Sequence, residues 1–232
     1  MKSARSVVVP TDMSSVALTD ENSSFNDDVQ YLGSGDNKFA ITITDGATWT
    51  GNSTGGIALS VALDDGGVWT GYHDEGTNVN SELNMTISNG AQWDNQSANK
   101  ETTVTKLTGA TDTDKAGFIR MSEKSNAGLT IKDYSGATTF IYRHNADNDI
   151  LGGNVNIQKA ADGSVVNVRT NSIGTSDKEE VTKVLQALAA KMIAGANAKA
   201  TLQGEAQIAE GIVTSASALK VGNIDFTNGT GV

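Results

Sequence analysis

The carboxylate pairs Asp64–Asp65 and Asp74–Glu75 are the residues of this sequence that come closest to a catalytic arrangement. Clustered carboxylates that hold calcium, with an Arg or Lys as base, would suit a polysaccharide lyase. Adjacent residues of a strand point to opposite faces of a sheet, so neither pair is expected to converge on one ligand. Asp65 is also explained by a turn with the glycine that follows it. We therefore expect no catalytic pair at these positions.

His144 is the second candidate, because it lies in the polar segment YRHNADND beside Arg143, Asp147 and Asp149. It could be a proton shuttle or a metal ligand, and a solvated loop between strands is the simpler interpretation. The acidic segments there and in DTDKAGF lack the ligand series of an EF-hand. The chain has no phosphate-binding Gly-x-x-x-x-Gly-Lys loop and no Gly-x-Ser-x-Gly nucleophile. We expect no catalytic residue, no cofactor and no metal site, and hence no enzyme.

The composition narrows the class of protein further. With 17 Lys and Arg against 27 Asp and Glu, the net charge is −10, which disfavours nucleic acid and anionic membranes as partners. There is no Cys, so disulfides and thiolate chemistry are excluded, and the scattered His73 and His144 do not indicate structural zinc. One Pro and 25 Gly point to many strands and turns.

Three near-copies of one segment organise the first half of the chain: ITITDGATWTG, LSVALDDGGVWTG and LNMTISNGAQWDN. Each contains an Asp-Gly or Asn-Gly pair whose glycine is followed three residues later by Trp49, Trp69 or Trp93. Apolar and polar residues alternate ahead of each pair, as in a strand with one buried face. The apolar positions three and five residues before the glycines are Ile41, Ile43, Val61, Leu63, Met85 and Ile87.

The repeat predicts a solenoid. A unit of this size cannot bury its own apolar face, so successive coils must stack, at about 4.8 Å per layer, with equivalent side chains above each other. The alternative is an antiparallel sandwich in which the Asp-Gly and Asn-Gly pairs are hairpin turns. The solenoid is favoured because the register repeats over a whole coil, which hairpins do not require.

The sequence contains one clear helix pattern, in TSDKEEVTKVLQALAAKM. Ser176 and Glu179 fit a capping box, and the helix is expected to run out into AGANAKA. An apolar stripe at helical spacing should pack on the solenoid; it comprises Val181, Val184, Leu185, Leu188 and Met192. The last residues, GNIDFTNGTGV, repeat the coil pattern at Asn228–Gly229, so we expect the native protein to continue beyond them.

Residues 128–174 contain LTIKDYSGATTFIYR and DNDILGGNVNIQKAADGSVVNVRTNSIG. This segment resembles the autochaperone region near the C-terminal end of pertactin-like passenger domains of Gram-negative (type V) autotransporters. The segments DGATWTG, DGGVWTG and NGAQWDN are similar to the Gly-Ala-x-Trp rungs of those passengers. LQALAAKM and LQGEAQIAEGIVTSAS resemble a segment that follows the cap in some of them. The resemblance covers roughly residues 35 to 220.

The resemblance implies an all-β fold, a right-handed parallel β-helix with a C-terminal capping region and one short α-helix. It implies a segment at 1–35 that is polar and expected to be flexible, β-helix coils at 36–127, an autochaperone-like cap at 128–174, and a helix with further strands at 175–232. Besides the six aliphatic residues and the three tryptophans, we expect structural roles in the cap for Tyr134, Phe140, Ile150 and Leu151.

The implied function is a non-catalytic stalk and folding cap of a secreted surface passenger, part of an adhesin or virulence-associated protein. The passenger would be anchored to the outer membrane by its own C-terminal barrel, which is absent from this chain. Its partners would be a host or bacterial surface protein or glycan, with self-association also open. Two alternatives remain: a β-helix enzyme acting on polysaccharide, and a carbohydrate-binding sandwich whose exposed tryptophans stack on sugars.

Overall fold

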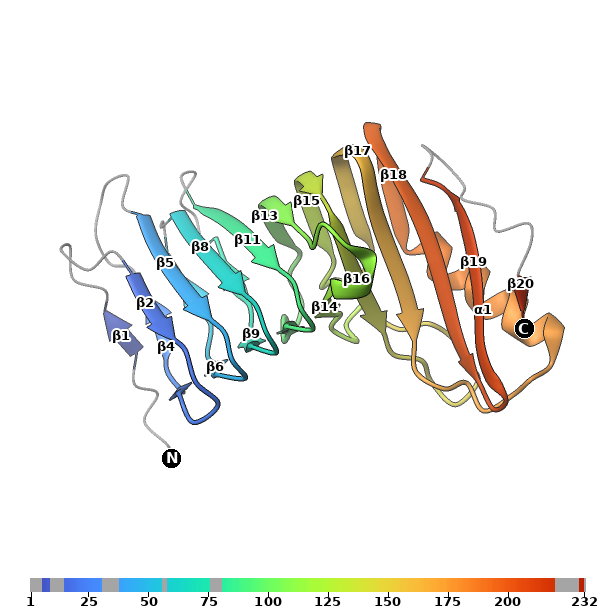
Figure 1. The fold of residues 1–232 in the computed structure, drawn as a ribbon, viewed down its shortest axis with the longest axis horizontal. Helices are drawn as coiled ribbons and strands as arrows, with labels where there is room; N and C mark the ends of the chain where they lie inside the picture. Colours follow the sequence, from blue (N-terminus) through green and yellow to red (C-terminus); the bar gives the residue numbers. More distant parts are fainter. Residues whose placement is uncertain are drawn as a thin grey trace.

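The strands wind into a stack of coils, which is a parallel β-helix (Figure 1). The computed structural model describes residues 6–8, 15–30, 38–55, 58–75, 81–219 and 230–231. Consecutive coils pair through parallel strands, and among the described strands only β18, β19 and β20 pair antiparallel. The predicted fold class is therefore confirmed, and the sandwich alternative is wrong.

Each coil has two main sides, and some coils also have a strand on a third side. The first side contains β2 (Ser15–Leu18), β5 (Lys38–Ile43), β8 (Ala58–Leu63), β11 (Glu82–Ile87), β13 (Thr102–Thr108) and β15 (Leu129–Ser135). The second side contains β3 (Ser24–Phe25), β6 (Thr48–Thr50), β9 (Val68–Gly71), β12 (Gln92–Asn95), β14 (Gly117–Arg120) and β16 (Ala137–Tyr142). The third side contains β1 (Ser6–Val8), β4 (Asp28–Gln30), β7 (Ser53–Thr54) and β10 (His73–Asp74).

Two long strands each cover both main sides of a coil. β17 (Val155–Thr170) pairs with β15 through its first half and with β16 through its second half. β18 (Met192–Ile208) pairs with β17 along both halves in the same way. β19 (Gly211–Ala218) then turns back antiparallel to β18, and β20 (Thr230–Gly231) pairs with β19. The β19 strand thus ends the parallel stacking on the second side.

Corners with left-handed backbone separate the first side from the second in the three repeated coils. Asp45, Asp65 and Asn89 have φ values of 55°, 43° and 48°, and the glycine after each has φ of 73° or 74°. Asp and Asn tolerate this region better than other residues with a side chain, and glycine enters it without strain. The Asp-Gly and Asn-Gly pairs are therefore corners of coils rather than hairpin turns.

The polar segment before residue 36 contains a coil of its own. Within residues 15–30, β2, β3 and β4 form a coil that pairs in parallel with the next one. Val16, Leu18 and Phe25 pack on the core, and this apolar contact fixes a segment whose composition is mostly polar. The coils also continue without a break across the expected boundary at 127/128, since β13 pairs with β15 over its whole length.

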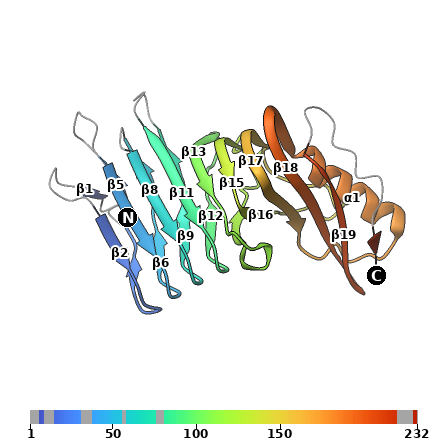
Figure 2. The same ribbon diagram turned by 45° about the horizontal axis from the view of Figure 1, so that its top comes forward.

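The helix α1 (Lys178–Ala190) begins one residue later than predicted. Its N-cap is Asp177, whose Oδ1 accepts hydrogen bonds from the N–H groups of Glu179 and Glu180, so the predicted capping box at Ser176 is wrong. The apolar stripe is buried from Val181 to Leu188, whereas Met192 is the first residue of β18. α1 stands at the C-terminal end of the stack, where it occupies the third side of the last coil (Figures 1 and 2).

The residues after α1 also differ from expectation. AGANAKA lies inside β18 rather than in a fraying helix end, because pairing with β17 imposes strand geometry on residues of low strand propensity. The coil pattern expected at Asn228–Gly229 lies outside the described residues. A short 3₁₀ helix, η1 (Thr113–Lys115), interrupts the corner between β13 and β14.

Candidate functional site

The three tryptophans occupy equivalent positions on consecutive coils and form a buried stack. Trp49 and Trp69 have ring centroids 4.7 Å apart with planes 5° from parallel, and Trp69 and Trp93 are 5.0 Å apart at 7°. All three side chains are 0% exposed. The tryptophans are therefore not the exposed stacking platforms that the sandwich alternative required. We call these three residues the tryptophan ladder.

Each indole of the ladder also ties its coil to the coil before it. The Nε1–H of Trp69 donates to the carbonyl oxygen of Gly51 at 2.9 Å, and that of Trp93 donates to Gly71 at 3.0 Å. Trp49 does the same with Asp27 at 3.1 Å. The ladder thus satisfies every indole donor with a backbone acceptor of the preceding coil, which a buried tryptophan requires.

Glycine two residues after the tryptophan makes this arrangement possible. A Cβ on Gly71 would lie 1.8 Å from the Gly51 carbonyl oxygen, and one on Gly51 would lie 2.1 Å from that of Asp27. Both oxygens are the acceptors of ladder indoles. The Trp-x-Gly spacing is therefore a packing requirement of the first two coils of the ladder, where WTG repeats, whereas Trp93 has Asn95 at the same spacing and still bonds Gly71.

The aliphatic residues of the repeat form two further buried columns. Ile41 lies opposite Val61, and Val61 lies opposite Met85; Ile43, Leu63 and Ile87 form the adjacent column. All six are at most 2% exposed. The first column continues through the register pairs of Met85 with Leu107 and of Leu107 with Tyr134. The core is thus continuous from the repeated coils into the C-terminal ones.

In the C-terminal coils, the hydroxyl of Tyr134 replaces the indoles as a link between coils. Tyr134 is 2% exposed, and its hydroxyl donates to the carbonyl oxygen of Val165 at 2.6 Å. The hydroxyl of Tyr142, which the sequence reasoning did not single out, donates to Gly153 at 3.0 Å. Burial raises the pKa of both phenols far above their usual value, so both stay neutral. Phe140 is fully buried between Ile119 and Val168 in register.

Two expected cap residues lie at the margin of the core, and Ile150 packs against it. Ile150 and Leu151 are both only half-buried. They lie where the loop after β16 folds back on itself: Ile150 bridges His144, and the Leu151 N–H donates to the carbonyl oxygen of Arg143 at 2.9 Å. The loop satisfies its own backbone at the surface, and this leaves the two side chains at the edge of the third side.

A buried histidine is the main feature that the sequence reasoning missed. His73 is 2% exposed, with Nδ1 2.5 Å from Ser53 Oγ and Nε2 3.0 Å from Ser81 Oγ. Burial lowers the pKa of His73 to about 4, although the charges of Glu75 and Asp74 act in the opposite direction. The imidazole is therefore neutral at pH 7.

The candidate carboxylates and His144 interact with neighbouring groups of the fold. Asp64 accepts hydrogen bonds from Ser88 Oγ at 2.8 Å and from Asn89 Nδ2 at 2.7 Å, and these bonds hold its pKa below the usual value despite partial burial. Glu75 accepts the N–H of Thr103 at 3.2 Å, while Asp74 pairs with Lys100. The ring nitrogens of His144 lie 2.8 and 3.1 Å from backbone carbonyl oxygens.

Within the described ranges, no group of three or more His, Asp or Glu residues is arranged to hold a metal ion. No helix in that same part of the chain is long and apolar enough to cross a membrane. Comparisons of the sequence with protein-family models and with curated proteins gave no match, and neither did a comparison with solved structures.

Proposed function

We propose that this chain is a rigid, non-catalytic stalk with a folding cap, and that it is part of an autotransporter passenger. The observation that carries the proposal is the continuous core, whose buried columns pass from the tryptophan ladder to the last coil. At that coil α1 covers the third side and β19 pairs with β18 on the second. A solenoid needs such a cover at its end, because the last coil has no successor to bury its apolar face.

The resemblance of residues 128–174 and of the Trp-containing rungs supports assignment to this class. In that role the chain would belong to an adhesin or virulence-associated protein at the cell surface, held to the outer membrane by a barrel. Its partner would be a host or bacterial surface protein or a glycan, and copies could self-associate. The net charge of −10 disfavours nucleic acid as a partner, because the phosphates would be repelled.

The cap is tested by Leu188→Asp, with Gln186→Asp as the matched control on the exposed face of α1. Leu188 is fully buried, and a carboxylate there costs enough free energy to detach α1 from the core. If the cap templates folding, the tryptophan fluorescence of the distant ladder should recover more slowly after dilution from urea in Leu188→Asp. Gln186→Asp should refold like the parent chain.

Circular dichroism at 222 nm establishes whether α1 is lost in Leu188→Asp. Wild-type recovery of the ladder fluorescence in a variant that has lost the helix would remove the folding role of the cap. Small-angle scattering tests the stalk separately: a rod of the same length as the wild type is expected for Gln186→Asp. A compact scattering profile for the wild-type chain would contradict the stalk.

A further inference from the structure

A groove runs along the outer face of the first side of the coils. One cavity of about 180 Å³ lies over β5, β8, β11 and β13, and a second of about 420 Å³ lies over β13, β15 and β17. Lys106 on β13 lines both cavities, so the two hollows adjoin at this side chain, and we call them together the groove. Six strands at about 4.8 Å spacing give the groove a length of about 24 Å along the coil axis.

The floor of the first cavity is made of small and hydrogen-bonding side chains. The hollow exists because the side chains at three of its positions are small: Ala40, Ser60 and Ala62. Hydroxyl and amide groups come from Thr42, Asn84, Thr86 and Thr108. These residues point outward because the alternating strands bury their apolar partners. Tyr134, the aromatic residue that lines the second cavity, is buried and its hydroxyl is already bonded. The groove therefore offers many polar groups and no exposed aromatic anchor.

The second cavity arises from a change in strand pattern. In β13, Val104 and Leu107 are both buried, so the two residues between them, Thr105 and Lys106, both stay outside. The same apolar-polar-polar-apolar pattern recurs in β15 and β17, where it places Asp133 and Lys159 in the next layers. The bulged positions widen the groove and carry its charges.

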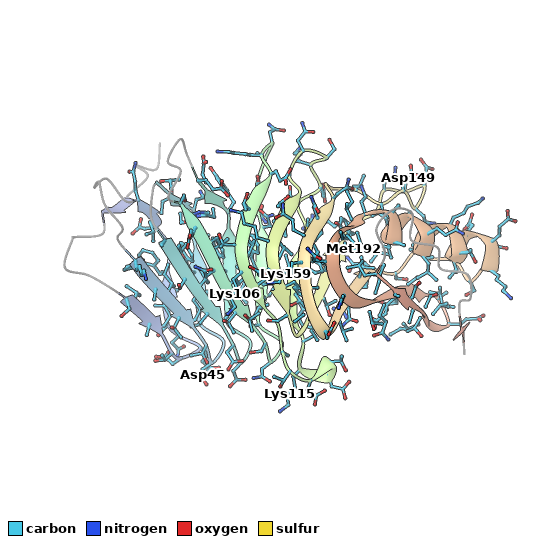
Figure 3. All side chains as sticks on the ribbon, turned by 90° about the horizontal axis from the view of Figure 1, so that it is seen from above. Asp45, Lys106, Lys115, Asp149, Lys159 and Met192 are labelled. Atoms are coloured by element: carbon cyan, nitrogen blue, oxygen red, sulfur yellow. The ribbon has the colours of Figure 1, made fainter. Side chains whose placement is uncertain are left out.

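Positive charge dominates this part of an acidic protein. Lys159 pairs with Asp133 at 3.1 Å, whereas the ammonium groups of Lys106 and Lys132 have no ion pair or hydrogen bond within the described part of the chain. Lys106 and Lys159 lie over the middle of the coils (Figure 3). Their Cα atoms are about 10 Å apart, because β15 lies between β13, which carries Lys106, and β17, which carries Lys159. Two lysines at this spacing suit widely spaced anionic groups better than the dense phosphates of nucleic acid.

We propose that this groove binds an acidic glycan, a chain of uronic-acid sugars, with a carboxylate on Lys106 and sugar hydroxyls on the polar floor. Protein partners are usually held by aromatic or Arg anchors seated in pockets, which the groove lacks. Sugar hydroxyls match a floor of Thr, Ser and Asn groups, each of which both donates and accepts. The proposal goes beyond the stalk and cap and does not depend on them.

The test is isothermal titration calorimetry of the full chain with a galacturonate hexasaccharide. The matched ligand is the same hexasaccharide with its carboxyl groups methyl-esterified. We expect saturable binding of the acidic form, weakened by added NaCl, and at least tenfold weaker binding of the ester. Lys106→Gln should weaken binding of the acidic form about tenfold, whereas Lys115→Gln, an exposed lysine outside the groove, should leave it unchanged.

A second pair of variants tests the shape of the groove. Ala62→Tyr fills the first cavity on an outward strand position that accepts tyrosine, and Thr50→Tyr makes the same change on the outer face of the second side. Ala62→Tyr should abolish binding, and Thr50→Tyr should not; both should keep the wild-type circular dichroism spectrum.

Absence of saturable binding would overturn the proposal, as would equal binding by Ala62→Tyr or Lys106→Gln and the wild type. Equal affinity for polyglutamate or a single-stranded oligonucleotide would also overturn it, because the face would then act only as an anion exchanger. Each of these results leaves the refolding test of the cap unaffected, so the two proposals can fail separately.

Discussion

The N-terminal and C-terminal coils share one architecture but are held together differently. From β5 to β12 the coils repeat the same residues: a left-handed corner, strict alternation on the first side, and a tryptophan whose indole bonds the coil before it. From β13 onward, the buried column of the second side contains a different residue in each layer: Ile119, Phe140 and Val168. The Tyr134 hydroxyl links two coils there, and a helix replaces the third side of the last coil.

The comparison shows two ways to stack coils: with the same residue at equivalent positions of successive coils, or with different residues that fill the same column. Identical side chains allow parallel stacking of rings at 4.7 to 5.0 Å, and in the first two coils of the ladder a glycine lies where a Cβ would meet the backbone oxygen that accepts the indole. The third coil of the ladder does without this glycine, although Trp93 still bonds the Gly71 carbonyl oxygen. Asn95 stands where Gly71 stood one coil earlier, and the next coil has Ile119 in place of a tryptophan.

The largest expected effect tests the demand for glycine. Gly71→Ala would place a Cβ 1.8 Å from the Gly51 carbonyl oxygen and 2.9 Å from the Trp69 indole nitrogen. We expect it to lower the free energy of unfolding by about 3 kcal/mol or more, since the ladder has no room to relax. Urea denaturation followed by tryptophan fluorescence measures the change.

The control for this change is Gly163→Ala in the C-terminal coils, where a Cβ would meet no atom within 4 Å. Its φ of +80° predicts a cost of only about 1 to 2 kcal/mol from backbone strain. Similar costs at the two glycines would mean that the ladder is no more tightly packed than the coils that follow it.

The next effect is a pH dependence located in the N-terminal coils. The pKa of His73 falls from its ordinary 6.5 to about 4 on folding, so between these values the unfolded chain binds more protons than the folded one. The contribution of His73 to stability is therefore present above pH 6.5 and is lost as the pH falls toward 4. A shift of this size corresponds to about 3 kcal/mol.

Urea denaturation at pH 7 and at pH 4.5 measures this dependence, with His73→Gln as the variant that should remove it. Fluorescence of the ladder should show the loss, because Ser53 and His73 lie one coil apart in the same region. An equal slope of stability against pH in the variant and in the wild type would assign the dependence to carboxylates elsewhere.

The sequence predicted the regular part of this contrast well. The alternation of strands such as ITI and VAL, the Asp-Gly corners and the Trp spacing repeat every coil, so the solenoid and its register could be read directly. The apolar stripe of α1 was equally clear. The burial of His73 could not be read from its neighbours alone, because it depends on Ser53 and Ser81 in other parts of the coils.

The C-terminal strand β18, the N-cap of α1 and the groove were harder to predict from the sequence, for physical reasons. β18 contains many Ala, Gly, Asn and Lys residues, and it becomes a strand only through pairing with its neighbours. Ser176 and Asp177 both suit an N-cap, and the extended ψ of 122° at Asp177 decided between them. The groove depends on side-chain sizes in strands more than 20 residues apart, although VTKL, IKDY and IQKA already carry its repeated bulge.

The smallest expected effect tests the link that Tyr134 makes between C-terminal coils. Tyr134→Phe keeps the buried ring but leaves the carbonyl oxygen of Val165 without the hydroxyl donor at 2.6 Å, so we expect a loss of about 1 to 2 kcal/mol. The control is Thr50→Val, at an exposed position on the second side of an N-terminal coil. It should change the free energy of unfolding by less than about 0.5 kcal/mol. Urea denaturation followed by circular dichroism measures both variants. If Tyr134→Phe is as stable as the wild type, the C-terminal coils are held by apolar packing alone, and the proposed equivalence between indole and hydroxyl ties is wrong.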